Sequence, residues 1–227
     1  MSRITSEFSV CISFGRAGCR INGNHAVDIC QPVCASAPEG QAVNTMTDFE
    51  NIKNHIETLI QDLPVFEYGF LTPEQIPFTE KVRTVCRLEC KRYGSSWSCP
   101  PAVGTVPECR ERCMAYRGAF FFSTVHEVRD SMNLTESFQT KRSHEQTTGL
   151  VEQRMRKAGL ETYRLSGDSC SICQECTYPV KPCRFPDRMH PCIEGHGIVV
   201  VKLAESCGME YYIDEHTQLW FSLIFYR

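Results

Sequence analysis

The 227-residue sequence has no hydrophobic run long enough to cross a membrane, since a spanning helix needs about 20 mostly apolar residues. It also lacks strong charge: the formal net charge of −3 gives no reason to expect nucleic acid or an acidic membrane surface as a partner. Neither a glycine-rich phosphate loop nor a nucleophile elbow is present. The sequence therefore lacks the signatures of membrane proteins, phosphate-loop proteins and nucleophile-elbow hydrolases.

A secretory signal is missing as well, because the first 20 residues carry Arg3, Glu7, Arg16 and Arg20 and no uninterrupted apolar stretch. We therefore expect a cytoplasmic location, where thiols stay reduced. The 15 cysteines, an odd number, are then expected to be metal ligands or catalytic thiols rather than a disulfide framework. Oxygen threatens cysteine-bound clusters, so an anaerobic setting is also expected.

The most distinctive stretch contains Cys170, Cys173 and Cys176 at every third position, followed by Cys183 after a longer gap. Bacterial ferredoxins hold a cubane iron–sulfur cluster with the similar pattern C-x2-C-x2-C-x3-C-P. Zinc sites share the C-x2-C unit but usually present two separated pairs. The run of three cysteines therefore favours an iron–sulfur cluster, with zinc as the alternative.

A second cysteine group lies upstream, so two four-ligand sites can be assembled. One trio is Cys170, Cys173 and Cys176, and the other is formed by three upstream residues, with two more cysteines available to close the sites. The upstream residues are Cys86, Cys90 and Cys99, and the closing residues are Cys183 and Cys109. Cys183 can close either site, since in two-cluster ferredoxins the remote cysteine ligates the other cluster. The sequence leaves this choice open.

Other candidates are weaker. Cys192 and Cys207 are expected in the core, because free cysteine is often buried, and for Cys109 and Cys113 packing into the core from one helix face is an equal alternative to a ligand role. His190 and His196 flank Cys192 and are the best minor ligand candidates among the histidines. Basic residues near the cysteines would offset the charge of a cluster or simply form a solvated surface; they are Arg87, Lys91, Arg92, Lys181 and Arg184.

The residue pattern predicts an α+β fold with a small mixed or antiparallel sheet, packed helices and two cysteine-rich cluster-binding loops. Residues 1–45, which include Cys11, Cys19, Cys30 and Cys34, show no period and are expected to be a disordered or loosely held extension. Residues 46–227 are expected to form the metal-binding domain. One helix is expected to begin at a capping box at 47–50 and another at a capping box at 105–108. Further helices are expected over 131–158, 188–194 and 198–207. Strands are expected over 66–71, 119–125, 161–165, 209–213 and 219–225, and the last two of these are expected to form an antiparallel pair.

The stretch Cys90–Gly104, CKRYGSSWSCPPAVG, and the stretch Cys170–Cys183 resemble the cysteine-rich "predicted metal-binding protein" family of unknown function, typical of anaerobic bacteria and archaea. The resemblance covers roughly residues 77–227 and implies metal or iron–sulfur binding without a settled reaction. Residues 1–45 have no counterpart in it, and the run Gly197–Val201 lacks the expected polar residue at a helix start.

The leading hypothesis is an iron–sulfur protein with two 4Fe–4S clusters that transfers electrons or donates them to a partner enzyme. A redox partner protein is then expected. The first alternative is a structural or redox-sensing metal-binding module with zinc or iron–sulfur. The second is a reductase in which a cluster iron short of one thiolate binds substrate directly. Whether the protein is an enzyme is left open at this stage, and no substrate cavity can be named from sequence.

Overall fold

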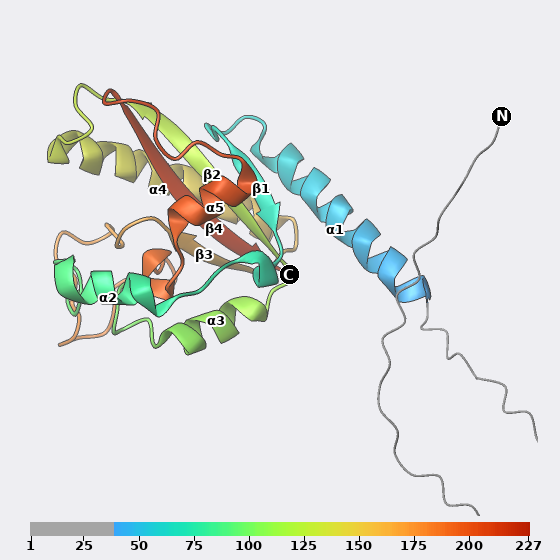
Figure 1. Cartoon of the computed structure of the whole chain (residues 1–227), viewed down its shortest axis with the longest axis horizontal. Helices are drawn as coiled ribbons and strands as arrows, with labels where there is room; N and C mark the ends of the chain where they lie inside the picture. Colours follow the sequence, from blue (N-terminus) through green and yellow to red (C-terminus); the bar gives the residue numbers. More distant parts are fainter. Residues whose placement is uncertain (1–38) are drawn as a thin grey trace, which may run out of the picture. The chain divides into compact units, whose positions relative to one another are not determined.

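The computed structural model describes residues 39–227, nearly all of which form one compact unit, Gly40–Arg227 (Figure 1). Within these residues the fold is α+β, with an antiparallel sheet of four strands in the order β1-β2-β4-β3. The predicted fold class is therefore confirmed. The four cysteines of the N-terminal extension lie outside the described residues, and the proposed boundary after residue 45 stays a prediction.

The sheet is built around its two long central strands, β2 and β4. β2 carries the apolar run AFFF and pairs with β4 over its whole length, which buries both strands deeply. The shorter strands β1 and β3 pair with β2 and β4 respectively and form the edges. The strand bounds are β1 Tyr68–Leu71, β2 Gly118–Glu127, β3 Thr162–Ser166 and β4 Thr217–Tyr226.

Alternate residues of the central strands enter two separate cores, because successive side chains of a strand point to opposite faces. Phe120 and Phe122 face a core that includes apolar side chains of helices α1 (Glu39–Ile60) and α4 (Leu134–Lys157). Phe121 faces the opposite core, which is covered by α5 (Val200–Cys207). Both faces of the sheet are therefore closed, and Figure 1 shows α5 in front of the strands.

Two expected helices are confirmed with their end signals. Helix α3, Val106–Met114, begins after Thr105, whose side chain accepts from the Glu108 amide as a capping box predicts. Helix α5 ends at Gly208, which adopts a left-handed φ of +66°. The long helix expected over 131–158 is α4, capped by the side chain of Asn133.

Other expectations are wrong. The capping box expected at 47–50 lies inside α1, which begins at Glu39; no proline interrupts the chain between these points. Residues 188–194 form turns before a short 3-10 helix, η2 (Glu194–His196), instead of an α-helix. Residues 209–213 form no strand, because both edges of β4 are already paired with β2 and β3.

Two elements were not anticipated from the sequence. They are the helix α2, Glu80–Glu89, and the 3-10 helix η1, Pro73–Gln75.

A buried histidine joins α4 to the sheet. His144 has 1% of its surface exposed, and its Nδ1 and Nε2 atoms lie 2.8 Å from the hydroxyls of Thr124 and Ser222 respectively. Burial lowers the pKa of His144 to about 3. The neutral ring is therefore part of the folded state.

Acidification is expected to destabilise the protein through this residue. Below about pH 6.5 the unfolded chain binds a proton at this histidine that the folded protein does not, so stability is lost as the pH falls toward 3. Between pH 7 and pH 5 the His144→Asn variant should lose about 2 kcal/mol less unfolding free energy than the wild type. Urea unfolding measures this difference, with His55→Asn on the exposed side of α1 as control. Equal losses in wild type and His144→Asn would contradict the prediction.

Candidate metal centre

The first cysteine group, called here the loop site, consists of Cys170, Cys173, Cys176 and Cys183. All four side chains line one small cavity of about 20 Å³, together with Trp97. The segment has no regular helix or strand, so its course is set by turns and by contacts to neighbouring segments. The structure therefore brings Cys183 to its own trio.

Amide groups of the loop surround these sulfurs. The pKa of Cys176 is lowered: partial burial opposes ionisation, but hydrogen bonds from the Tyr178 and Trp97 amides outweigh it. The Trp97 nitrogen lies 3.4 Å from the Cys176 sulfur. At Cys170 burial raises the pKa although the amide of Ile172 hydrogen-bonds to the sulfur. Amide donors two residues after a cysteine stabilise the charge of a metal-bound thiolate, so this loop suits a thiolate-ligated centre.

The second group, called here the helix site, consists of Cys86, Cys90, Cys99 and Cys192, which line a larger cavity of about 620 Å³. Cys86 lies in the last turn of α2, and Cys90 is the extended residue that follows the end of this helix. The Cys99 and Cys192 sulfurs lie 3.9 Å apart, and the Gly195 amide donates to the Cys192 sulfur over 3.1 Å. Four thiols from three separate segments therefore border one cavity.

At the helix site the pKa of two of the four thiols, Cys86 and Cys192, is raised. Burial, followed by the charges of Cys90 and Glu194, raises the pKa of Cys86 to about 11. Of the close pair, Cys99 is the more acidic, since a hydrogen bond from Cys192 lowers its pKa. The same hydrogen bond and burial raise the pKa of Cys192. Metal binding here must therefore release protons, and it is expected to strengthen with rising pH.

Cys109, expected as a ligand, lies apart from both cavities. It is fully buried on the inner face of α3, as is Cys113, and its sulfur donates to the carbonyl of Val103 over 3.4 Å. Cys192 is buried, as expected of a core residue, and its sulfur also lies beside that of Cys99. One feature of the sequence could have pointed to Cys192: it is preceded by proline, as is Cys183 of the loop site. Cys207 is half-buried and packs against the core on the face of the sheet to which Phe121 points.

The segment between Trp97 and Cys99 joins the two sites. The Ser98 hydroxyl accepts from the Cys170 amide over 2.9 Å, and the Ser98 carbonyl accepts from the Cys192 amide over 3.0 Å. The Trp97 indole also donates to the Lys181 carbonyl over 3.0 Å. The two cysteine groups are thus connected, although they are far apart in sequence.

Ser98→Ala is expected to loosen this junction. The substitution leaves the buried Cys170 amide without its acceptor, and such a loss costs about 1–3 kcal/mol. Chemical denaturation should show this decrease in unfolding free energy, while Ser143→Ala, on the exposed surface of α4, should change it by less than about 0.5 kcal/mol. If both variants unfold like the wild type, the junction does not hold the segments together.

A buried charged network fixes the loop to α4. Lys141, 2% exposed, contacts the Glu145 carboxylate over 2.9 Å and the Ser169 carbonyl just before the loop. Glu145 also contacts the Ser171 hydroxyl, and its Oε1 lies 3.1 Å from Nε2 of His190. Burial opposes ionisation of Glu145, but His190 and Lys141 outweigh it and lower its pKa to about 2. The loop is therefore held at its start and just beyond its end.

The two histidines considered as minor ligands have other partners. His190 belongs to the Glu145 network, and His196 lies 2.7 Å from the Tyr163 hydroxyl and 3.0 Å from the Cys192 carbonyl. The five basic residues near the cysteines are all exposed, as expected of a solvated surface. Within residues 48–227 no three histidine, cysteine or acidic side chains converge on a point that could hold a metal ion. The thiol donors instead border cavities.

Comparison with known families adds the decisive observation. Residues 69–226 match the family described as "Predicted metal-binding protein (DUF2284)". The chain belongs to this family. The matched region contains every cysteine of the loop site and the helix site, and all four strands except the first residue of β1. DUF2284 is therefore the cysteine-rich family expected from the two motifs, and metal binding by the family accords with the thiol donors grouped here.

Searches of curated proteins and of solved structures find no match. Among residues 39–227, moreover, none of the helices combines the length and the hydrophobicity that a membrane crossing requires.

Proposed function

We propose that this DUF2284 protein holds two iron–sulfur clusters and works as an electron carrier or donor for a partner redox protein. The observation that carries the proposal is the grouping of eight thiols into two adjacent sets of four. The ligands are Cys170, Cys173, Cys176 and Cys183 at the loop site and Cys86, Cys90, Cys99 and Cys192 at the helix site.

The donor set fits such clusters chemically. Four thiolates are the usual ligands of a 4Fe–4S core, and amide hydrogen bonds to the sulfurs are one of the features that tune its potential. The loop site supplies amide donors to Cys170 and Cys176, and the helix site supplies the Gly195 amide to Cys192. The clusters supply the one-electron chemistry, and the protein's own residues hold, hydrogen-bond and partly bury them.

The adjacency of the sites supports the carrier role. Ser98 hydrogen-bonds to the backbone of one cysteine in each group, so any two centres are connected through a single residue. A cytoplasmic location, a redox partner protein, and no role for nucleic acid or membrane belong to the same proposal. An electron entering at one site has a short route to the other.

Zinc at the loop site is a second candidate, favoured by one observation. The loop cavity of about 20 Å³ has room for about one water-sized sphere, which suits a single ion better than an eight-atom core. Four cysteines are a common set for structural zinc. In that case the loop site is a structural or regulatory metal module.

Anaerobic purification followed by iron, sulfide and zinc analysis tests the proposal. Two 4Fe–4S clusters require about eight iron and eight sulfide per chain, visible absorption and reversible reduction in voltammetry. Stoichiometric zinc without a reversible wave would overturn the carrier role, because zinc has no accessible redox couple. About four iron and one zinc per chain would assign one cluster to the helix site and zinc to the loop.

A further inference from the structure

The cavity beside the helix site is much larger than its four thiols require. At about 620 Å³ it lies in the size range of cavities that bind small organic molecules. The cysteines come from α2, from the segment ending at Cys99, and from the residues before η2. The rest of the lining comes from other parts of the chain, namely the start of β4, Val200 of α5, and residues 131–132, 167–169 and 211–212.

These other parts bring aromatic rings to the cavity. Tyr211 stacks on Phe221 with ring centroids 5.5 Å apart and an interplanar angle of 19°. Tyr212, also in the lining, is 65% exposed despite its size. Aromatic faces attract cations through their quadrupole, and tryptophan and tyrosine do so best. The wall therefore suits an apolar or aromatic body that carries a positive charge.

The same cavity also has acidic residues in its lining. Its two charged lining residues, Asp168 and Glu194, are both acidic, and neither lysine nor arginine contributes to it. Two buried oxygens, Oε2 of Glu194 and Oε1 of Gln218, have no hydrogen-bond partner in the part of the chain described. A buried acceptor without a donor is costly, so a ligand that brings donors is favoured.

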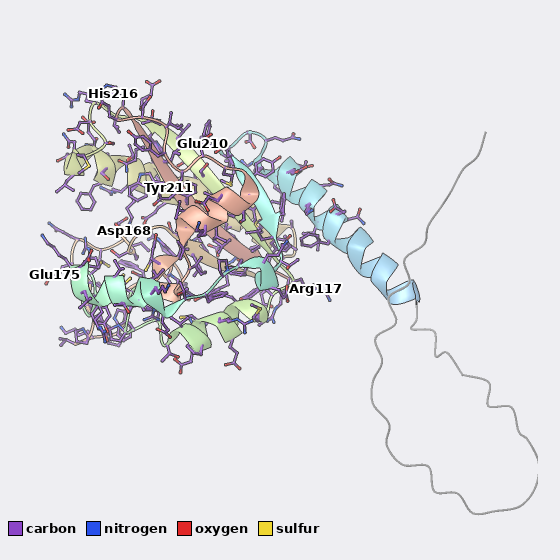
Figure 2. The ribbon with its side chains drawn as sticks, in the orientation of Figure 1. Arg117, Asp168, Glu175, Glu210, Tyr211 and His216 are labelled. Atoms are coloured by element: carbon purple, nitrogen blue, oxygen red, sulfur yellow. The ribbon has the colours of Figure 1, made fainter. Side chains whose placement is uncertain are left out.

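Asp168 is held in an unusual backbone conformation at this wall. Its φ of +61° is left-handed, a conformation that few residues other than glycine adopt, and Lys141 lies 3.9 Å from its carboxylate on the α4 side. The Asp168 side chain is exposed, and Figure 2 shows it on the same side of the molecule as Tyr211. The fold therefore places a carboxylate in the lining of the cavity.

We propose that this cavity binds a small organic cation, an amine with an apolar or aromatic body. The ammonium group is held by Glu194 and Asp168 with Gln218, and the body lies against Tyr211 and Tyr212. The inference does not depend on which metal the cysteines bind, because these five residues are not ligands. It also supplies the ligand cavity that the reductase hypothesis lacked in the sequence.

Isothermal titration of the full chain, as purified anaerobically, tests the charge preference with matched probes. The cations are 2-phenylethylamine and benzyltrimethylammonium, the neutral control is 2-phenylethanol, and the anion is 3-phenylpropanoate. We expect at least one cation to bind at least tenfold more tightly than the alcohol, and no measurable binding of the anion. Absence of binding by both cations, or equal binding of cations and alcohol, would overturn the proposal.

Substitutions of the two acidic residues test whether the cation binds in this cavity. Glu194→Gln is expected to weaken cation binding about tenfold and to leave binding of the alcohol unchanged, whereas Glu111→Gln, on the exposed side of α3, should change neither. Asp168→Asn gives the same test at an exposed position if Glu194→Gln does not fold. Unchanged cation affinity in a folded Glu194→Gln or Asp168→Asn protein would overturn the assignment. Metal analysis of each sample separates this outcome from failure of the iron–sulfur proposal.

Discussion

Replacing Cys192 with serine is expected to remove the metal of the helix site and to leave the loop site loaded, so that bound metal falls by about half. Cys192 lines the same cavity as Cys86, Cys90 and Cys99, and its sulfur lies next to that of Cys99. Serine is a poor substitute for a thiolate ligand of iron or zinc. Cys173→Ser should remove the other half by the same reasoning.

Cys109→Ser is the matched control, since Cys109 is also a buried cysteine but lines neither cavity. Its metal content should equal that of the wild type even if its stability is lower. Iron, sulfide and zinc analysis of the three anaerobically prepared variants decides the matter. Loss of metal from Cys109→Ser with retention in Cys192→Ser would restore Cys109 as the closing ligand.

Lys141→Met is expected to cost about 3–5 kcal/mol of unfolding free energy, the range found when one member of a buried ion pair is removed. The substitution leaves the buried carboxylate of Glu145 without its cation and the Ser169 carbonyl without its donor. The loss should also loosen the start of the cysteine loop, because Ser169 immediately precedes it.

Urea unfolding of the metal-free chain measures this cost separately from metal affinity. Lys202→Met serves as the control, because Lys202 pairs with Glu205 on the surface, where ion pairs contribute about 1 kcal/mol or less. A loss below about 1 kcal/mol for Lys141→Met would mean that water replaces the ammonium group, and that the network does not anchor the loop.

Local signals predicted part of the fold well. The capping box at Thr105, the apolar run of β2 and the stop at Gly208 act over a few residues, so a sequence window contains their whole cause. The pairing of β4 depends on partners about 100 residues away, which no window contains. Helix α2 has no buried residue, because its apolar stripe of Val82, Val85 and Cys86 lines the helix-site cavity instead of entering the core.

The candidate site, like the fold, could be predicted only where its cause lies within a short stretch of sequence. The grouping of Cys170, Cys173 and Cys176 was predictable because they follow one another at short, regular gaps, whereas the sequence left open which group Cys183 joins. The helix site was predictable only in part, because Cys192 lies 93 residues from Cys99 and no spacing rule connects them. Burial alone pointed to a core residue, and the fold had to show that its sulfur borders a cavity. The acidic and aromatic wall is assembled from still more distant segments.

The sheet order has a consequence for the folding rate. β3 touches β2 only through β4, so the two halves of the sheet stay separate until β4 inserts between them. Contacts between residues so far apart in sequence slow folding, since loop closure must precede them. Cys99 lies before β2, and Cys192 lies between β3 and β4. Their sulfurs should therefore meet late, and capture of metal at the helix site should report completion of the central pairing.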